Sequence, residues 1–255
     1  MRRKPHTHRQ KTRRIALVAA ACLPTFAHAG DWAYSATLYG WMAGLDTSIE
    51  TAQGTLETEL SFADVLEKLD AAFFGAFEAQ SEKLGFILDL NHTNLTASKD
   101  TPFGAAFRSA TVETTLSIAS GYATWRVSDT AAAQVDIAGG FRAYDLDLDV
   151  TLNANTLPTR SFTDGDRWVD PLVGFRVQLP ISDRWSASAL ADIGGFGIGN
   201  ASEMSWQATA TVEYSFNETW ALRAGYSHMD IDKDLDGRDV TLTLSGPVLG
   251  ISARF

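Results

Sequence analysis

The chain has 255 residues, and its 31 acidic side chains against 21 lysines and arginines give a formal net charge of −10 at pH 7. Such an acidic protein repels polyanions, which excludes nucleic acid as a partner. A single cysteine excludes a disulfide framework.

The first 29 residues have the three parts of a secretory signal peptide. Seven basic residues and no acid precede the apolar run 15–27, and small residues at 27 and 29 flank a cleavage position before Gly30. We therefore expect a signal peptide over 1–29 and a single mature domain over 30–255. Removal of the signal peptide would leave 14 of the 21 basic residues against 31 acids, a net charge of −17.

The signal segment also holds the residue that would support a lipid anchor. Cys22 fits that alternative, but Ala19 stands where the attachment motif requires a larger aliphatic residue. After cleavage only His92 and His228 remain as histidines and no cysteine remains. No metal site, thiol chemistry or cofactor is expected.

From Trp32 onward the chain alternates between apolar and polar residues, which is the period of a β-strand. The alternating stretches are 32–42, 71–80, 86–93, 109–127, 134–143, 169–179, 185–192, 203–216, 220–227 and 240–255. The connections near Ser81, Ser128, Ile181 and Asn217 are short, and the alternate ones, including loops at 97–107 and 153–166, are longer. This alternation predicts that the short turns and both chain ends lie at the periplasmic end of the barrel, here called the inner end, and that the long connections lie at the outer end. The pattern predicts an all-β, antiparallel up-and-down barrel of about ten strands, with eight and twelve as alternatives.

The first long connection contains a predicted helix. The segment 45–60 is expected to form a polar hairpin around Gly54, which would raise the strand count to twelve if it is fully formed. Ser61 is a typical N-cap for a helix over 61–69, with Asp64 in its first turn. One helix face is apolar, and we expect it to rest on the barrel wall or in its mouth: Phe62, Val65, Leu66 and Leu69.

Two strands change the phase of their alternation. Val112, Leu116, Ile118 and Tyr122 share one phase, whereas Trp125 and Val127 have the other. A bulge near Ser120 and Gly121, and a second one near 245–247, would keep all apolar side chains on the outer face. In the stretch after 134 the outer row becomes acidic at Asp145, Asp147 and Asp149, so the lipid-facing belt is expected to end near Ala143.

Aromatic residues gather at strand ends, as at the two interfaces of a membrane barrel. They include Tyr214, Phe216, Trp220 and the final residue, Phe255. Here the chain resembles the outer-membrane β-barrel proteins of Gram-negative bacteria, in the small porin-like superfamily that includes the OmpA-transmembrane-domain-like and OmpW-like barrels. The resemblance implies an outer-membrane location, contact with membrane lipid and lipopolysaccharide, and Phe255 as a signal for the barrel-assembly machinery.

The strand parities place ten charged side chains in the lumen: Glu78, Asp89, Asp136, Arg142, Asp170, Arg176, Asp192, Glu213, Arg223 and Arg254. Such charges either pair to fill a narrow barrel or line a water-filled path that favours cations, because acids outnumber arginines. About ten strands are too few for an open general porin. The expected function is a narrow passive channel for small solutes or a structural envelope barrel.

Other functions have weaker support in the sequence. Ser227, His228 and Asp230, with Asp145 and Asp147 as partners, are the best constellation for an outer-membrane protease or lipase. Adjacent residues of a strand point to opposite faces, however, which disfavours a serine triad, and no catalytic residue is assigned. The acidic cluster at 230–239 favours a solvated loop over divalent-ion bridging to lipopolysaccharide. A surface adhesion or docking role remains an alternative.

Overall fold

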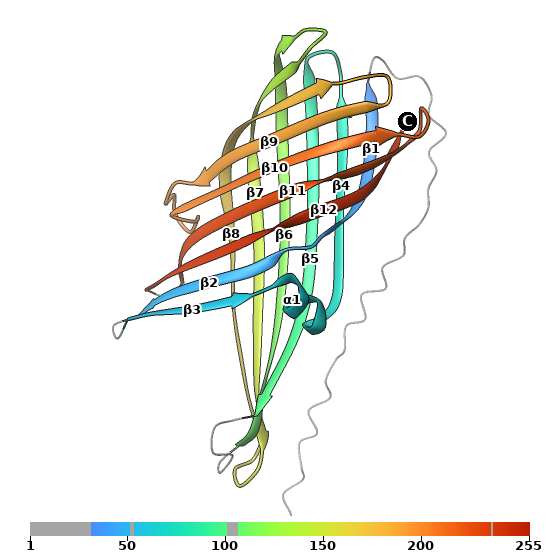
Figure 1. Cartoon of the computed structure of the whole chain (residues 1–255). Coiled ribbons are helices and arrows are strands. Elements are labelled where there is room, and N and C mark those ends of the chain that lie inside the picture. Colours follow the sequence, from blue (N-terminus) through green and yellow to red (C-terminus); the bar gives the residue numbers. More distant parts are fainter. Residues whose placement is uncertain (1–31, 52–53, 101–106, 236) are drawn as a thin grey trace, which may run out of the picture. The chain divides into compact units, whose positions relative to one another are not determined.

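A computed structural model describes residues 32–51, 54–100, 107–235 and 237–255, so the predicted signal peptide lies outside the described residues. Twelve strands and one short helix account for most of them (Figure 1). The strands are β1 (Ala33–Trp41), β2 (Gly44–Thr51), β3 (Gly54–Leu60), β4 (Leu69–Gln80), β5 (Leu84–Asp100), β6 (Phe107–Asp129), β7 (Gln134–Ala154), β8 (Arg160–Pro180), β9 (Trp185–Gly195), β10 (Met204–Ser215), β11 (Trp220–Leu235) and β12 (Arg238–Arg254).

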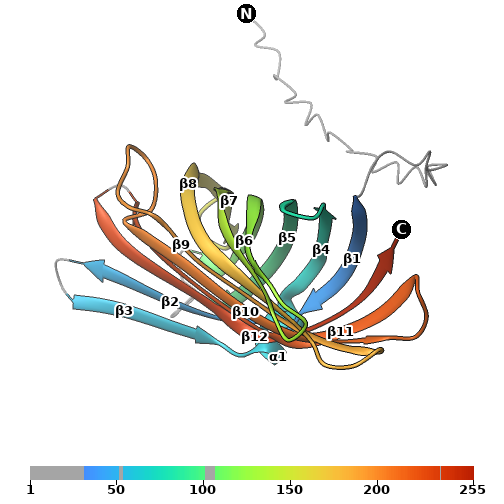
Figure 2. The ribbon, with the colours of Figure 1, turned by 90° about the horizontal axis from the view of Figure 1, so that it is seen from above.

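Ten of these strands form a closed antiparallel barrel. Each strand from β4 to β12 pairs with its neighbour in sequence, and β1 pairs with both β4 and β12. Figure 2 shows the β4–β8 side and the β9–β12 side facing each other across the lumen. The predicted up-and-down barrel of about ten strands is confirmed.

The two remaining strands extend the barrel wall on one side. The hairpin β2–β3 continues from β1 and pairs through β2 with the outer half of β12 (Figure 1). Among the described strands β3 pairs only with β2. The hairpin predicted over 45–60 is therefore present as two strands outside the closed ring.

The strands between β5 and β8 continue well beyond the lipid-facing belt (Figure 1). The predicted loop at 97–107 is wrong in its first part, because β5 and β6 remain paired up to Asp100. The predicted loop at 153–166 is too long: only residues 155–159 connect the two strands, and β8 pairs with β7 from Arg160 onward. Serine, threonine and valine are frequent here, and these residues fit a paired strand even without lipid contact.

Within the belt, large apolar side chains point outward. Trp125, Ile137 and Val173 are each at least half exposed, although each is strongly apolar. Such exposure is stable only against hydrocarbon. The outward row of β7 becomes polar at Asp145, so the predicted end of the belt near Ala143 agrees with the paired register.

Aromatic side chains gather at the inner end, as predicted. Tyr34 stacks on both Phe77 and Phe255, with ring centroids 6.2 and 6.1 Å apart. Trp185 and Tyr214 lie 4.9 Å apart on neighbouring strands. Recognition of Phe255 by the assembly machinery stays a prediction.

Neither predicted bulge exists. β6 pairs in continuous register with β5 and β7 through Ser120 and Gly121, and its irregularities lie instead at 107–109 and 126–128. Ile118 and Tyr122 are 3% and 5% exposed and lie inside the barrel, whereas Trp125 lies outside. β12 is likewise continuous through 245–247.

The phase changes have a different physical cause. Inside the membrane the outer row of a strand must be apolar, whereas beyond it the outer row faces water and becomes polar. On β12 the outer row passes from Leu249 to Thr243, while the inner row passes from Ser252 to Leu244. The strand therefore exchanges its apolar and polar faces without any change in backbone register.

The helix α1 (Phe62–Lys68) precedes β4 and contacts β2, β3 and β5. Ser61 and Asp64 form a capping box, in which each side chain bonds the other residue's backbone N–H. Phe62 and Val65 line the upper lumen, as expected for a helix resting on the wall. Leu66 does not belong to this face, because it is 54% exposed.

Candidate functional site

The outer part of the lumen holds a cavity of about 660 Å³, which we call the upper basin. Its wall comes from α1 and from β1, β2, β4–β8, β11 and β12, and its lining includes the charged residues Asp164, Asp166, Asp234 and Arg238. Most of the lining side chains are apolar: Leu45, Phe62, Val65, Leu69, Phe74, Leu95, Leu116, Ile118, Leu146, Leu148, Val240, Leu242 and Leu244.

The basin follows directly from the exchange of faces. On β7, Tyr144, Leu146 and Leu148 point into the lumen, and the aspartates between them point out. Leu116 and Thr114 of β6 stand beside Leu146 and Leu148 in the register. The inner rows of these strands therefore form an apolar wall at the level where their outer rows are polar.

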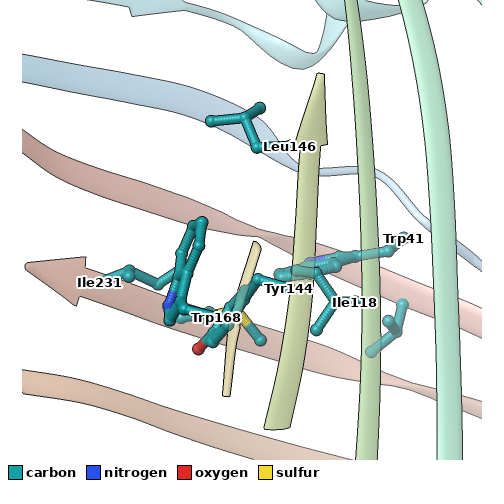
Figure 3. Close-up of a cluster of buried hydrophobic side chains, with 8 residues drawn as sticks. Trp41, Ile118, Tyr144, Leu146, Trp168 and Ile231 are labelled. Atoms are coloured by element: carbon teal, nitrogen blue, oxygen red, sulfur yellow. The ribbon is translucent and has the colours of Figure 1, made fainter. Parts of the chain in front are cut away.

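A cluster of large buried side chains, which we call the floor, borders the basin at Trp41, Ile118 and Leu146 (Figure 3). Tyr144 and Trp168 stack with ring centroids 4.6 Å apart, and Met229 and Ile231 are almost fully buried beside them. Trp41 belongs to the same cluster.

The connection between β9 and β10 folds back onto the floor. Trp168 donates its indole N–H to Ser202 Oγ at 2.9 Å, and Ser202 donates its backbone N–H to Asp170 at 2.8 Å. Gly195 begins this loop with φ +84°, and an added Cβ would lie 2.4 Å from the Ser202 carbonyl oxygen. Glycine is required there by both the backbone angle and the close approach.

Below the floor, ion pairs fill the inner lumen. Arg142 and Asp192 are fully buried and meet at 3.0 Å. Arg176 bridges Asp136 at 2.7 Å and Glu78 at 3.0 Å.

The ion-paired network continues to the inner rim. Arg223 pairs with Glu78 and Glu213, and Arg254 also contacts Glu213. Arg126, which the sequence analysis did not assign to the lumen, donates to Asp136 at 2.9 Å. The signal was present in the sequence, because Trp125 and Val127 were expected on the outer face and the residue between them therefore faces the lumen.

The structure places the ten predicted charged residues on the lumen side and joins six of them in one network, whereas Arg142 and Asp192 form a separate pair. Asp170 stands apart, since its carboxylate accepts the Ser202 N–H and the Ser205 hydroxyl. Asp89 also stands apart, and it borders a smaller chamber of about 130 Å³. Tyr39 and Asn91 surround its carboxylate, and both are neutral residues that a search for charges did not select.

The candidate hydrolytic constellation is not assembled. Ser227 lies in the lumen, where it bonds Thr209 and Gln207, whereas His228 lies on the outer face against Trp206. Asp230 accepts a hydrogen bond from a threonine on that same outer face. In the described part of the chain, no cluster of three histidine, cysteine or acidic side chains is arranged to hold a metal ion.

The outward acidic residues have local partners above the belt. Asp145 pairs with Arg167 at 2.7 Å, and both side chains are well exposed. The hydrogen bond and charge of Asp145 raise the pKa of Arg167. A search of the described helices finds none with the length and apolar character of a membrane-spanning helix.

Comparison with known proteins agrees on the fold. No family model and no curated sequence matches the chain. The outer membrane protease OmpT from Escherichia coli has similar architecture, with 8% identity, a TM-score of 0.57, and coverage of 91% of this chain and 99% of the other.

Two further solved structures are more distant. The translocator domain of the autotransporter NalP from Neisseria meningitidis is 14% identical with a TM-score of 0.47, covering 89% of this chain and 90% of the other. The attachment invasion locus protein Ail of Yersinia pestis is 9% identical with a TM-score of 0.34, covering 88% and 98%. This chain has the closed β-barrel fold of outer-membrane proteins from Gram-negative bacteria.

Proposed function

We propose that this outer-membrane barrel binds an apolar small molecule in the upper basin, at the outer surface of the envelope. The observation that carries the proposal is the exchange of faces, through which leucines line the lumen above the belt while polar residues line the outside. Binding pockets for small molecules have similar volumes and similarly apolar walls.

A water-filled channel mouth would have the opposite lining. Exposing apolar surface to water costs roughly 2.5 kcal/mol per 100 Å². The inner rows of β6, β7 and β12 carry leucines where serine or threonine would form an equally good strand. Their apolar character favours an apolar occupant over an aqueous vestibule.

The narrow passive channel expected from the sequence is the second candidate. The inner lumen is filled by buried ion pairs such as Arg142–Asp192, which oppose free passage of water and ions. The polar chamber beside Asp89 is the feature that favours a channel, because it continues the lumen beneath the floor. We propose that the resting barrel conducts little and that binding in the basin is its main activity.

The hydrolase and adhesion alternatives have less support. Ser227 and His228 lie on opposite sides of the wall, so the best catalytic constellation has no common site. An adhesion role would require a ligand for the outer loops, and the basin offers a defined site instead.

The test is binding of the apolar fluorophore N-phenyl-1-naphthylamine to refolded protein in nanodiscs, with empty discs as background. Thr114→Trp fills the basin, because Thr114 lines it beside Leu148. Thr115→Trp adds the same side chain to the outer face, where Thr115 accepts a hydrogen bond from Asn94.

The wild type and Thr115→Trp are expected to show saturable binding with one site, and Thr114→Trp to lose most of it. Absence of saturable binding in the wild type, or equal binding by both tryptophan variants, would contradict the proposal.

A further inference from the structure

Asp89 of β5 differs from Glu78, the other carboxylate that borders the chamber in the inner lumen. Its oxygens accept hydrogen bonds from the Tyr39 hydroxyl at 2.9 Å and from Asn91 Nδ2 at 2.5 Å. Both donors are neutral. Within the described residues Asp89 forms no ion pair, whereas Glu78 and Glu213 each meet two arginines.

The surrounding charges do not neutralise it. Six carboxylates face five guanidinium groups in the inner lumen: Glu78, Asp89, Asp136, Asp170, Asp192 and Glu213 against Arg126, Arg142, Arg176, Arg223 and Arg254. Arg142 and Glu78 act on Asp89 with opposite signs, and Arg142 is already bound to Asp192. A carboxylate left without a cation in a low-dielectric interior is costly, so a cationic partner stabilises it.

The space beside Asp89 shares part of its lining with the apolar basin. Asp89 borders the chamber of about 130 Å³, well above the ~10–15 Å³ that one water molecule needs by this kind of measure. Trp41 and Asn91 line both the chamber and the upper basin, so the two cavities meet at these side chains. A single elongated ligand can therefore contact both.

We propose that the ligand of the upper basin is an amphiphile with a cationic amine head, and that Asp89 binds the head while the apolar body occupies the basin. This inference rests on the proposed function and specifies the ligand class. An ammonium group would donate charge-assisted hydrogen bonds to the free lone pairs of Asp89.

The test compares octylamine, octanol and octanoate as competitors of the naphthylamine fluorophore in zwitterionic nanodiscs at pH 7. The three share one chain and differ only in the charge of the head. Hydrogen bonds to charged groups contribute about 1.5–3 kcal/mol, so the wild type should bind octylamine at least about tenfold more tightly than octanol. Octanoate should bind more weakly than octanol.

Asp89→Asn keeps the shape and the neighbouring hydrogen-bond donors and removes the charge. It should bind octylamine and octanol within about threefold of each other, since the charge-assisted hydrogen bond is lost. Asp147→Asn is the matched control, because Asp147 is an exposed carboxylate on the outer face of β7. It should keep the wild-type preference, and the heat-modifiable gel shift of each barrel verifies its folding.

The outcomes separate this inference from the proposed function. If the wild type binds octanol and octylamine equally, or if Asp89→Asn keeps the full preference for octylamine, the cationic ligand class is refuted and basin binding stands. If no octyl compound displaces the fluorophore and the fluorophore itself does not bind, the proposed function fails. The wild-type comparison alone decides the matter if Asp89→Asn does not fold.

Discussion

Removing the carboxylate of Asp192 is expected to destabilise the barrel far more than removing a carboxylate from its outer extension. Arg142 and Asp192 have no exposed side-chain surface and meet at 3.0 Å. Asp192→Ala would leave the guanidinium charge of Arg142 buried without a counter-ion, which costs about 3–5 kcal/mol. Arg142 keeps neutral acceptors in Ser120 and Gln207, so we expect the lower end, near ~3 kcal/mol.

The matched control is Asp145→Ala. Asp145 pairs with Arg167 at 2.7 Å, but their side chains are 39% and 73% exposed. Exposed ion pairs contribute about 0–1 kcal/mol, so this variant should differ little from the wild type. The assay is equilibrium unfolding in urea of barrels refolded into phospholipid vesicles, followed by tryptophan fluorescence.

A third variant distinguishes the buried charge from a general packing defect. Arg142→Met combined with Asp192→Leu removes both charges and should recover much of the stability lost in Asp192→Ala. The explanation is refuted if Asp192→Ala and Asp145→Ala have the same free energy of unfolding, or if the double variant is less stable than Asp192→Ala.

Three further predictions follow from other parts of the barrel. Gly140→Ala places a Cβ 1.9 Å from a backbone oxygen of β6 and should lower the free energy of unfolding by ~1–3 kcal/mol. In Gly139→Ala the nearest atom is 3.9 Å from the added Cβ, so the free energy of unfolding should change by less than about 0.5 kcal/mol. Val173→Lys on the lipid face should cost ~2–4 kcal/mol and Thr163→Lys on the outer extension almost nothing, and equal losses in the same urea assay would contradict the position of the belt. Hydrogen bonds from the N-cap serine lower the pKa of Asp64. The capping box therefore stabilises α1 fully when the pH is above the ordinary aspartate pKa of about 3.9, and this contribution is lost as the pH falls through the lowered pKa. Hydrogen exchange of α1 should therefore accelerate in acid, and an equal acceleration in Asp64→Asn would show another cause.

The barrel itself was predictable because two signals in the sequence are local. Alternation fixes strands, and aromatic residues such as Trp185 and Tyr214 mark their inner ends. The acidic outer row that begins at Asp145 marked the limit of the belt, because even one charged side chain against hydrocarbon carries a large energetic cost.

The upper basin was not predicted, although its residues were noticed. Leu116 and Ile118 alternate out of phase with Trp125, and a bulge was predicted between them because apolar side chains were expected to face lipid along the whole strand. That assumption holds only within the belt, and above it the outer row faces water. A cavity also depends on register between strands far apart in sequence, such as β6 and β12, which alternation within one strand does not contain.

Pair partners in the inner lumen could be predicted only in part. Parity placed Arg176 and Glu78 inside, but their contact joins β8 to β4 across the lumen. Parity alone also gave no reason to separate Asp89 from the other carboxylates. Its lack of a cation appears only once every arginine has been assigned a partner.

The exchange of faces between the belt and the outer extension is tested most directly by spin labels on single-cysteine variants of β7 in nanodiscs, comparing positions 137 and 138 with 148 and 149. We predict that 137 is accessible to oxygen from the lipid and 138 is protected, whereas 149 is accessible to a water-soluble nickel reagent and 148 is not. Equal nickel accessibility at 148 and 149, or oxygen accessibility at 138 equal to that at 137, would contradict an apolar lumen above a lipid-facing belt.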